Sequence, residues 1–201
     1  MTPTLILVGA YLLGGVPFGY LLVRWRSGQD VRTMGSGNIG ATNVLRTSGR
    51  AAGIVTLLLD IAKGYFAVWA AGGLTSGDAT WMSAAAVAVM LGHAFPVFLK
   101  FRGGKAVASF IGAFLCLTPL PLIAVVAIFF AAVAIWRYIS LGSILAAGCF
   151  PLAVWMISRP SAAVLAAALF SGAFIIWRHA SNIGRLRAGA EHRFHFGGGA
   201  K

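Results

Sequence analysis

The sequence predicts an all-α integral membrane protein, a polytopic bundle of about seven transmembrane helices. Of its 201 residues, 59% are hydrophobic and only 10% are charged, a composition that water-soluble domains do not reach because they must cover their core with polar surface. The charges are also unbalanced, with 16 Lys and Arg against 4 Asp and Glu and a net charge of +12. The bilayer is therefore the expected solvent, and the candidate partners are anionic.

Crossing the hydrocarbon layer takes about 20 predominantly apolar residues. The candidate spans, in chain order, are Thr4–Val23, Ala52–Leu74, Thr80–Leu99, Gly104–Leu117, Leu120–Trp136, Ser140–Ile157 and Ser161–Trp177. The fourth is the shortest, about 21 Å of helix. We expect it to be tilted, partly re-entrant, or paired with the fifth span as a hairpin broken at Pro119 and Pro121. No basic segment precedes the first span, so we expect it to stay in the mature protein.

The distribution of Lys and Arg gives the expected orientation, because short cytoplasmic connections carry an excess of both. With the N-terminus outside and the C-terminus in the cytoplasm, all but two of the 16 basic residues fall on the cytoplasmic side. The exceptions are Arg159 on the opposite face and Lys63 within a span. We expect one domain over residues 1–201, with a mobile tail at 197–201.

Several classes of function are disfavoured by what the sequence contains. The aromatic residues lie in apolar runs and do not alternate with basic residues, which argues against nucleic-acid binding. Cys116 and Cys149 are also in apolar runs, where a thiol behaves as a small hydrophobe. His192 and His195 have no carboxylate-rich neighbourhood, so no metal site is expected. With four acidic residues and no nucleophile elbow, the site is expected to work by binding and positioning anions.

The most informative motif is a glycine-rich and amide-rich segment on the first cytoplasmic connection. Its members are Gly35, Ser36, Gly37, Asn38, Gly40, Thr42 and Asn43, followed by Arg46. Glycines allow backbone N–H groups to converge on an anion, the polar side chains add donors, and arginine binds oxyanions through two hydrogen bonds. The segment predicts a phosphate cradle. The alternative is a flexible polar loop, and a Walker A loop is excluded because no Gly-Lys-Ser/Thr ends it.

Two further basic motifs are candidates for the same site. Gly103, Gly104 and Lys105 form a glycine turn that could bring backbone and an ammonium group to a ligand, or could be an ordinary positive-inside connection. His179 and Asn182 are spaced to share a helix face and could donate to a phosphate or a polarised carbonyl. The alternative for this histidine is a structural residue at the membrane interface.

Three residues within the spans are predicted to be structural. Asp60 and Lys63 are three residues apart, a spacing that favours an ion pair within one helix and lowers the cost of placing charge in the membrane. His93 ends the third span, where it is expected to cap the helix or form local hydrogen bonds.

Taken together and in order, these motifs resemble those of the bacterial acyl-phosphate:glycerol-3-phosphate acyltransferases. The matching segments are 36–43 with Arg46, 59–64, 92–96, 103–105, 179–183 and 189–191. The resemblance as a whole runs from about Gly14 to Glu191. The visible departures are small: Arg102 stands where the family often has lysine, and His192 and Arg193 follow Glu191 where proline and lysine are common.

The resemblance implies a reaction and a location. A fatty acyl group would pass from acyl phosphate to the 1-hydroxyl of sn-glycerol 3-phosphate, giving lysophosphatidic acid and phosphate in phospholipid biosynthesis. The enzyme would need no cofactor or metal and would work on the cytoplasmic side of the cell inner membrane. The alternative is a transporter for an organophosphate anion, expected to carry polar groups at mid-membrane depth and on both faces. Acyl-chain preference and oligomeric state are left open.

The candidate site residues fall into three sets. The expected catalytic residues are Ser36, Arg46, Lys105, His179 and Asn182. The expected phosphate-binding residues are Gly35, Ser36, Gly37, Asn38, Gly40, Thr42, Asn43, Arg46, Gly103, Gly104 and Lys105. Asp60, Lys63, His93 and Glu191 are expected to support them. The acceptor of the hydroxyl proton is either His179 or a substrate phosphate oxygen.

Overall fold

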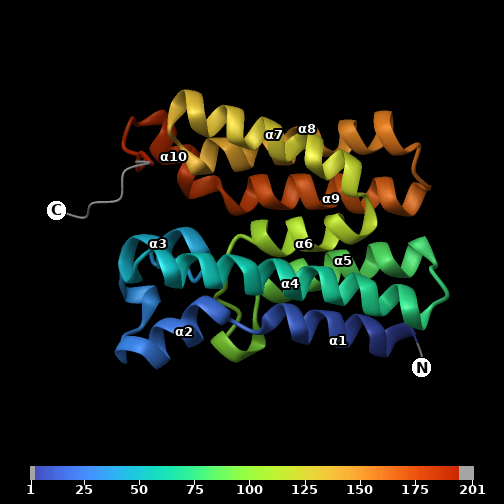
Figure 1. Ribbon diagram of the computed structural model, residues 1–201, viewed down its shortest axis with the longest axis horizontal. Helices are drawn as coiled ribbons and strands as arrows, with labels where there is room; N and C mark the ends of the chain where they lie inside the picture. Colours follow the sequence, from blue (N-terminus) through green and yellow to red (C-terminus); the bar gives the residue numbers. More distant parts are fainter. Residues whose placement is uncertain (1–2, 195–201) are drawn as a thin grey trace. The chain divides into compact units, whose positions relative to one another are not determined.

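The computed structural model describes residues 3–194, and this part of the chain is helical with no strand (Figure 1). The α-helices are α1 (Pro3–Gly15), α2 (Phe18–Ser27), α3 (Ala41–Ser48), α4 (Arg50–Leu74), α5 (Ala79–Ala94), α6 (Val107–Leu117), α7 (Pro119–Trp136), α8 (Ile139–Ser158), α9 (Ala162–Arg178) and α10 (Ala180–Arg187). Two short 3₁₀ turns, η1 (Val31–Thr33) and η2 (Val97–Leu99), lie in the connections. The tail predicted to be mobile, 197–201, lies outside the described residues.

Several helices are long and apolar enough to cross a membrane. Five candidate spans are found over the described residues, Thr4–Ser27, Arg50–Leu74, Ala79–Leu99, Pro119–Trp136 and Ile139–Ser158. Helices α9 and α10 would together make a sixth candidate, although a bend of 54° separates them. Helix α6 has 11 residues, about 16 Å, which is shorter than the hydrocarbon layer. The all-helical membrane fold is confirmed, whereas the count of seven spans stays a prediction.

The chain divides into two compact units, Met1–Leu117 (the first unit) and Thr118–Lys201 (the second unit). In the first unit, α4 packs closely against α6. A Cβ on Gly64 would collide with the backbone oxygen of Ser109, and one on Gly112 would collide with that of Ile61. Such close backbone approach is how helices associate in lipid, where apolar side chains gain little by leaving the solvent.

In the second unit, α8 packs against both α7 and α9. Pro119 is the first residue of α7, a position that suits proline because its missing N–H would have no acceptor inside the helix. The chain breaks at Thr118, between α6 and α7, as in one of the three alternatives considered for the fourth span.

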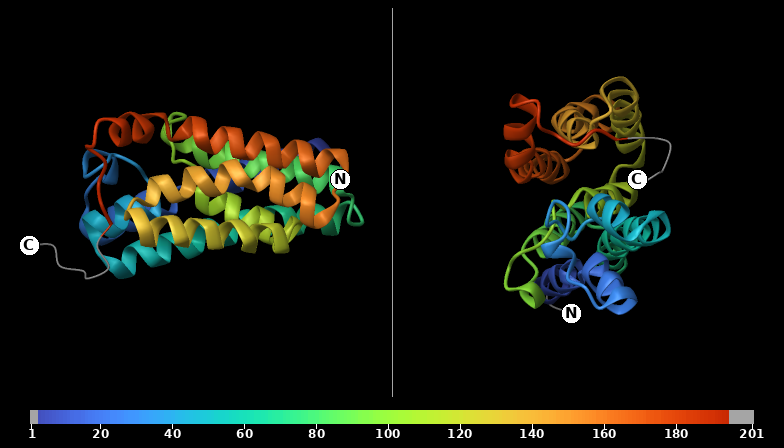
Figure 2. Two further views of the ribbon diagram at one scale, coloured as in Figure 1. Left: turned by 90° about the horizontal axis from the view of Figure 1, so that it is seen from above. Right: turned by 90° about the vertical axis from the view of Figure 1, so that its left-hand side faces the viewer.

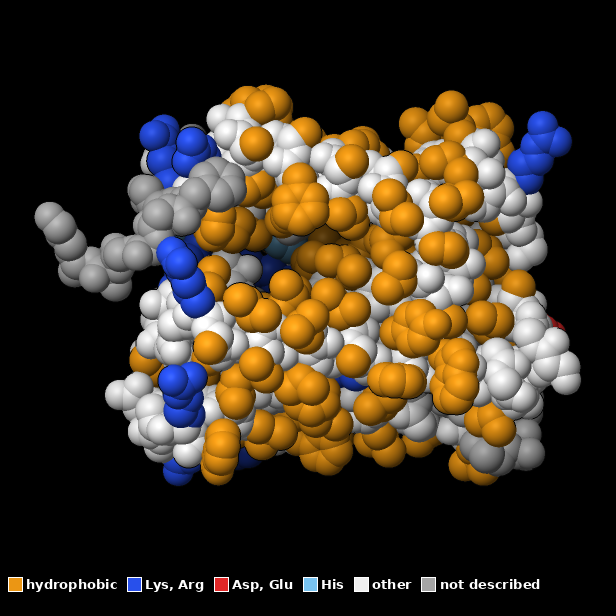
Figure 3. Space-filling view, viewed as in Figure 1, with side chains coloured by type: hydrophobic (Ala, Val, Ile, Leu, Met, Phe, Trp, Pro, Cys, Tyr) orange, Lys and Arg blue, Asp and Glu red, His pale blue; other side chains and the backbone are white. Residues whose placement is uncertain are grey.

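In each unit, the basic residues gather at one end of the helices. In the first unit, the α2–α4 connections lie at one end, and the start of α1 and the α4–α5 turn lie at the other; the α5–α6 connection lies beside the α1–α2 junction, toward the α2–α4 end (Figures 1 and 2). In the second unit, the α7–α8 turn and α10 lie opposite the α8–α9 turn, where Arg159 is exposed. Figure 3 shows apolar side chains along the helices and Lys and Arg mainly at these ends. The charge pattern read from the sequence is thus a spatial feature of each unit.

Candidate active site

The predicted phosphate cradle is organised by one buried side chain, that of Asn43 in the first turn of α3. Only 2% of this residue is exposed. Its Nδ2 donates to the carbonyl oxygens of Val31, Met34 and Asn38, at 3.2, 3.0 and 2.8 Å. Its Oδ1 accepts from the N–H of Ser36 at 2.9 Å. Asn43 therefore holds the loop in shape, and its amide is already used within the protein rather than turned toward a ligand.

The glycines of the loop adopt conformations that other residues avoid. Gly35 and Gly37 have φ of +54° and +71°, in the left-handed region where a Cβ is strained. A Cβ on Gly35 would also collide with the Asn43 Oδ1. The loop closes where the N–H of Gly40 donates to Asn38 Oδ1 at 2.8 Å. The loop shape thus depends on glycine at Gly35 and on the two asparagines.

This frame leaves a group of donors at the start of α3. Helix geometry gives the first N–H groups of α3, those of Ala41 and Thr42, no acceptor within the helix, and the helix dipole makes this end positive. Ser36 is exposed and Thr42 half-buried. Arg46 follows Thr42 by one turn and is exposed on the same helix. Such a set of N–H, hydroxyl and guanidinium groups is suited to bind a phosphate dianion.

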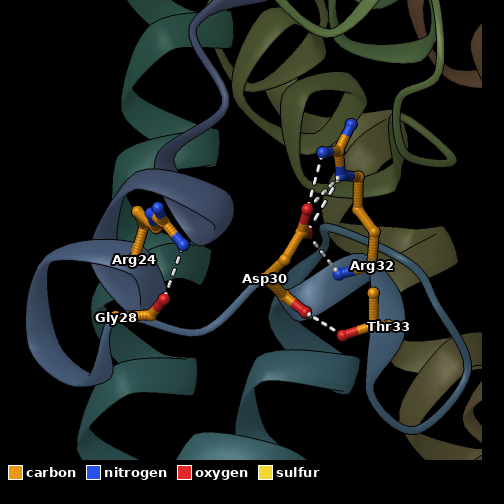
Figure 4. A network of polar contacts seen from close by, with 5 residues as sticks. All are labelled: Arg24, Gly28, Asp30, Arg32 and Thr33. Atoms are coloured by element: carbon orange, nitrogen blue, oxygen red, sulfur yellow. Dashed lines mark hydrogen bonds and ion pairs between the residues drawn. The ribbon is translucent and has the colours of Figure 1, made fainter.

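The outer part of the same connection is held by a carboxylate clamp, the Asp30–Arg32 pair, which was not among the predicted site residues (Figure 4). The Asp30 carboxylate accepts from the Arg32 backbone N–H at 2.9 Å and from its guanidinium at 2.6 to 3.1 Å. These hydrogen bonds lower the pKa of Asp30 to about 2. Thr33 Oγ1 donates to the Asp30 carbonyl at 2.9 Å, and Arg24 Nη1 donates to that of Gly28 at 2.6 Å. Arg32 is therefore committed to the loop structure.

The second predicted phosphate motif uses its glycines differently. The N–H groups of Gly103 and Gly104 donate to the carbonyl oxygens of Ala94 and His93, each at 3.1 Å. A Cβ on Gly104 would collide with the His93 imidazole. The close approach that these glycines permit is thus to the end of α5. Lys105 follows directly and is half-buried, so the motif offers a point charge on a well-anchored backbone.

The two motifs of the first unit share a buried apolar base. Val31 of η1, Ile39 of the loop, Val44 of α3 and Leu99 of η2 belong to one core cluster, together with Val23 and Ala52. This cluster ties the glycine–asparagine loop to the connection that carries Lys105.

Next to the connection that carries Lys105, α4 and α5 bury a small charged cluster. Lys63 Nζ lies 2.8 Å from Asp60 Oδ1, with both side chains at most 2% exposed, so the ion pair expected from their spacing is formed. Lys63 also donates to the Val16 carbonyl at 2.9 Å. His93 Nδ1 lies 3.7 Å from the same Asp60 oxygen, a contact that the spacing of these residues does not predict.

The third predicted motif belongs to the second unit. His179 lies at the bend between α9 and α10 and is 3% exposed. Its Nδ1 is 2.8 Å from the Ile175 carbonyl oxygen, which can only accept, so Nδ1 carries the proton and Nε2 holds the lone pair in the neutral ring. This tautomer gives Nε2 the capacity to accept a proton.

Asn182 is held by Glu191, which anchors the segment after α10. The buried Glu191 carboxylate accepts from Asn182 Nδ2 at 2.8 Å, Ser140 Oγ at 3.0 Å and Arg185 Nε at 2.7 Å. Burial raises the pKa of Glu191, but the hydrogen bonds from these three residues outweigh burial and the pKa lies below its usual value. Ser140 and Arg185 were not predicted as partners, because their contact depends on how the chain folds back after α10.

The chemistry of the described residues is that of anion binding. No group of three or more His, Cys, Asp or Glu side chains within residues 3–194 is placed to hold a metal ion. The expectation that the reaction needs no metal or cofactor stays a prediction.

Comparison with known proteins decides the family. A family model described as glycerol-3-phosphate acyltransferase matches residues 4–189. The chain belongs to the glycerol-3-phosphate acyltransferase family. This confirms the resemblance carried by the sequence motifs. The family assignment favours the enzyme over the organophosphate transporter.

Relatives in this family match the chain over nearly its whole length. The glycerol-3-phosphate acyltransferase of Desulforamulus reducens is 43% identical over 194 residues, covering 96% of each chain. That of Trichlorobacter lovleyi is 50% identical over 190 residues, covering 94% of this chain and 95% of the relative.

Crystal structures in the family share the fold. PlsY (YgiH), an integral membrane glycerol 3-phosphate acyltransferase, matches in its glycerol 3-phosphate form with a TM-score of 0.92 and 36% identity, over 97% of this chain and 96% of that one. Its lysophosphatidic acid form matches over the same shares with a TM-score of 0.88 and 34% identity. The chain is therefore an integral membrane protein of this family.

Proposed function

We propose that this protein transfers a fatty acyl group from acyl phosphate to the 1-hydroxyl of sn-glycerol 3-phosphate. The hydroxyl oxygen attacks the acyl carbonyl carbon, the carbonyl–phosphate bond breaks, and lysophosphatidic acid and inorganic phosphate leave. One observation carries the proposal: the loop that the Asn43 side chain holds in shape places N–H and hydroxyl donors, together with Arg46, around the start of α3. The chain that carries this loop belongs to the glycerol-3-phosphate acyltransferase family. Both proposed substrates carry a phosphate that such a site would bind.

The residues divide the work between binding and orientation. Ser36, Thr42 and the first N–H groups of α3 bind one phosphate, and Arg46 and Lys105 supply positive charge to the substrate phosphates. His179 and Asn182 orient glycerol phosphate or the reacting carbonyl. The hydroxyl proton passes to His179 Nε2 or to a substrate phosphate oxygen.

No covalent nucleophile is needed in this scheme, because acyl phosphate already contains a good leaving group. Holding the hydroxyl and the carbonyl in attack geometry, while neutralising the departing phosphate, supplies the acceleration.

The same proposal includes the placement of the protein in the membrane. It is a multi-pass protein of the cell inner membrane with seven spans, an outside N-terminus and a cytoplasmic C-terminus; residues 1–201 form one acyltransferase domain, and the active site faces the cytoplasm. The basic end of each unit supports this orientation, since cytoplasmic connections carry the excess of Lys and Arg.

The test is an assay of the purified protein with labelled glycerol 3-phosphate and either acyl phosphate or an acyl thioester as donor. We expect labelled lysophosphatidic acid with acyl phosphate alone. Product from the thioester alone would overturn the donor assignment, and product from neither would overturn the proposed function.

A further inference from the structure

His93 joins two features of the first unit that are far apart in sequence. It lies near the end of α5 and is 4% exposed. On one side its Nδ1 is 3.7 Å from the Asp60 carboxylate of α4. On the other its imidazole abuts Gly104, so closely that any Cβ there would collide with Nε2. The ring is thus held between a buried anion and the residue that precedes Lys105.

The Asp60 side of this contact is firmly anchored. Asp60 is 2% exposed and pairs with Lys63 at 2.8 Å, and Lys63 also donates to the Val16 carbonyl at 2.9 Å. Buried ionic groups of this kind are costly to separate, because removing one partner leaves the other charge uncompensated. Movement of His93 toward Asp60 is therefore resisted.

The Gly104 side is anchored by the backbone. The carbonyl oxygen of His93 accepts from the Gly104 N–H, and that of Ala94 accepts from the Gly103 N–H, both at 3.1 Å. The end of α5 and the glycine turn therefore form a paired segment with the imidazole beneath it. A smaller side chain at position 93 would keep these backbone bonds and leave the turn without its support.

We propose that His93 is a positioning residue for Lys105. The imidazole transmits the fixed position of the Asp60–Lys63 pair to Gly104 and so sets where the neighbouring Lys105 ammonium meets a substrate phosphate. This inference rests on the proposed function, in which Lys105 binds a substrate phosphate. Misplacing such a group by about 1 Å can cost about 100-fold in rate.

Three substitutions separate the two contacts of the ring. His93→Leu removes both. His93→Gln carries an amide to the place of Nε2 and keeps the support of Gly104, whereas His93→Asn carries one to the place of Nδ1, near Asp60. We expect His93→Leu and His93→Asn to lower kcat/KM at least tenfold, and His93→Gln to recover most of it. Ser83→Ala, which removes another buried polar group from α5, is the matched control and should keep wild-type activity.

A double-mutant cycle with Lys105→Ala tests whether His93 acts through Lys105. If it does, His93→Leu lowers kcat/KM at least tenfold in the wild type and less than twofold in the Lys105→Ala background. If the rate of Lys105→Ala is too low to measure, the cycle is run with Lys105→Arg instead. Equal losses in both backgrounds, or wild-type activity of His93→Leu, would overturn the inference. Wild-type activity of Lys105→Ala would instead refute the proposed role of Lys105.

Discussion

The two glycine-containing connections of the first unit resemble one another in sequence but use glycine for different purposes. In the loop 35–43, Gly35 and Gly37 supply positive φ, and the Asn43 side chain binds the resulting turn from inside. In the turn 103–105, the glycines allow the backbone to lie against His93, and their N–H groups are used by α5. The first connection therefore offers several donors to an anion, whereas the second offers mainly the charge of Lys105.

The largest effect is expected from Asn43→Ala. It removes four hydrogen bonds from the loop and leaves buried carbonyl groups without a donor, at a cost of about 2–4 kcal/mol. We expect kcat/KM to fall about 100-fold or more and the thermal midpoint in detergent to drop. Ser48→Ala, at the other end of α3, is the control. A wild-type rate for Asn43→Ala would show that the loop keeps its shape without this side chain. It would contradict the contrast between the two connections.

Gly35→Ala and Gly104→Ala sharpen the contrast between the two glycine roles. At Gly35 an alanine meets both a left-handed φ and the Asn43 amide, whereas at Gly104 it meets the His93 ring. We expect activity losses of at least tenfold for both, measured as kcat/KM. Gly9→Ala, where a Cβ would meet nothing within 4 Å, should behave as wild type. A wild-type rate for either variant would show that the neighbouring groups make room for the added Cβ and that the glycine is not required there.

The second unit offers a test of a different kind, because its anchor is a carboxylate. The pKa of Glu191 is lower in the folded protein than its ordinary value of 4.5. The stabilisation that the ionised Glu191 gives the folded protein is therefore complete above about pH 4.5. It is lost as the pH falls through the lower pKa of Glu191 in the folded state. We expect Glu191→Gln to lower the thermal midpoint at pH 7 and to flatten its dependence on acid pH. A mutant as acid-sensitive as the wild type would mean that other carboxylates dominate the acid response.

The smallest effect is expected from Asp30→Asn. The clamp between Asp30 and Arg32 lies at the surface, where ion pairs contribute little and are screened by salt. We expect kcat/KM within about threefold of wild type and a difference that shrinks at high salt. A loss of kcat/KM comparable to that of Asn43→Ala would show that the Asp30–Arg32 clamp supports the loop as much as the buried Asn43 side chain does.

The all-helical membrane fold followed from the sequence, because the thickness of the bilayer directly constrains the length and composition of its helices. The site was harder to predict in detail. Asn43 was expected to donate to a phosphate, since an asparagine in a glycine loop gives no sign that its amide will be buried; its hydrogen bonds exist only once η1 and α3 have folded together. The contacts of His93 with Asp60 and of Ser140 with Glu191 likewise join residues distant in sequence, which spacing alone does not reveal.

The central claim is that Arg46 and Lys105 supply the charge that binds substrate phosphate. The most direct measurement is kcat/KM for acyl phosphate and for glycerol 3-phosphate in Arg46→Ala and Lys105→Ala, with folding checked by gel filtration. We predict that each substitution lowers kcat/KM at least tenfold, about 1.4 kcal/mol of transition-state stabilisation. Wild-type values for both substrates in both variants would contradict the account.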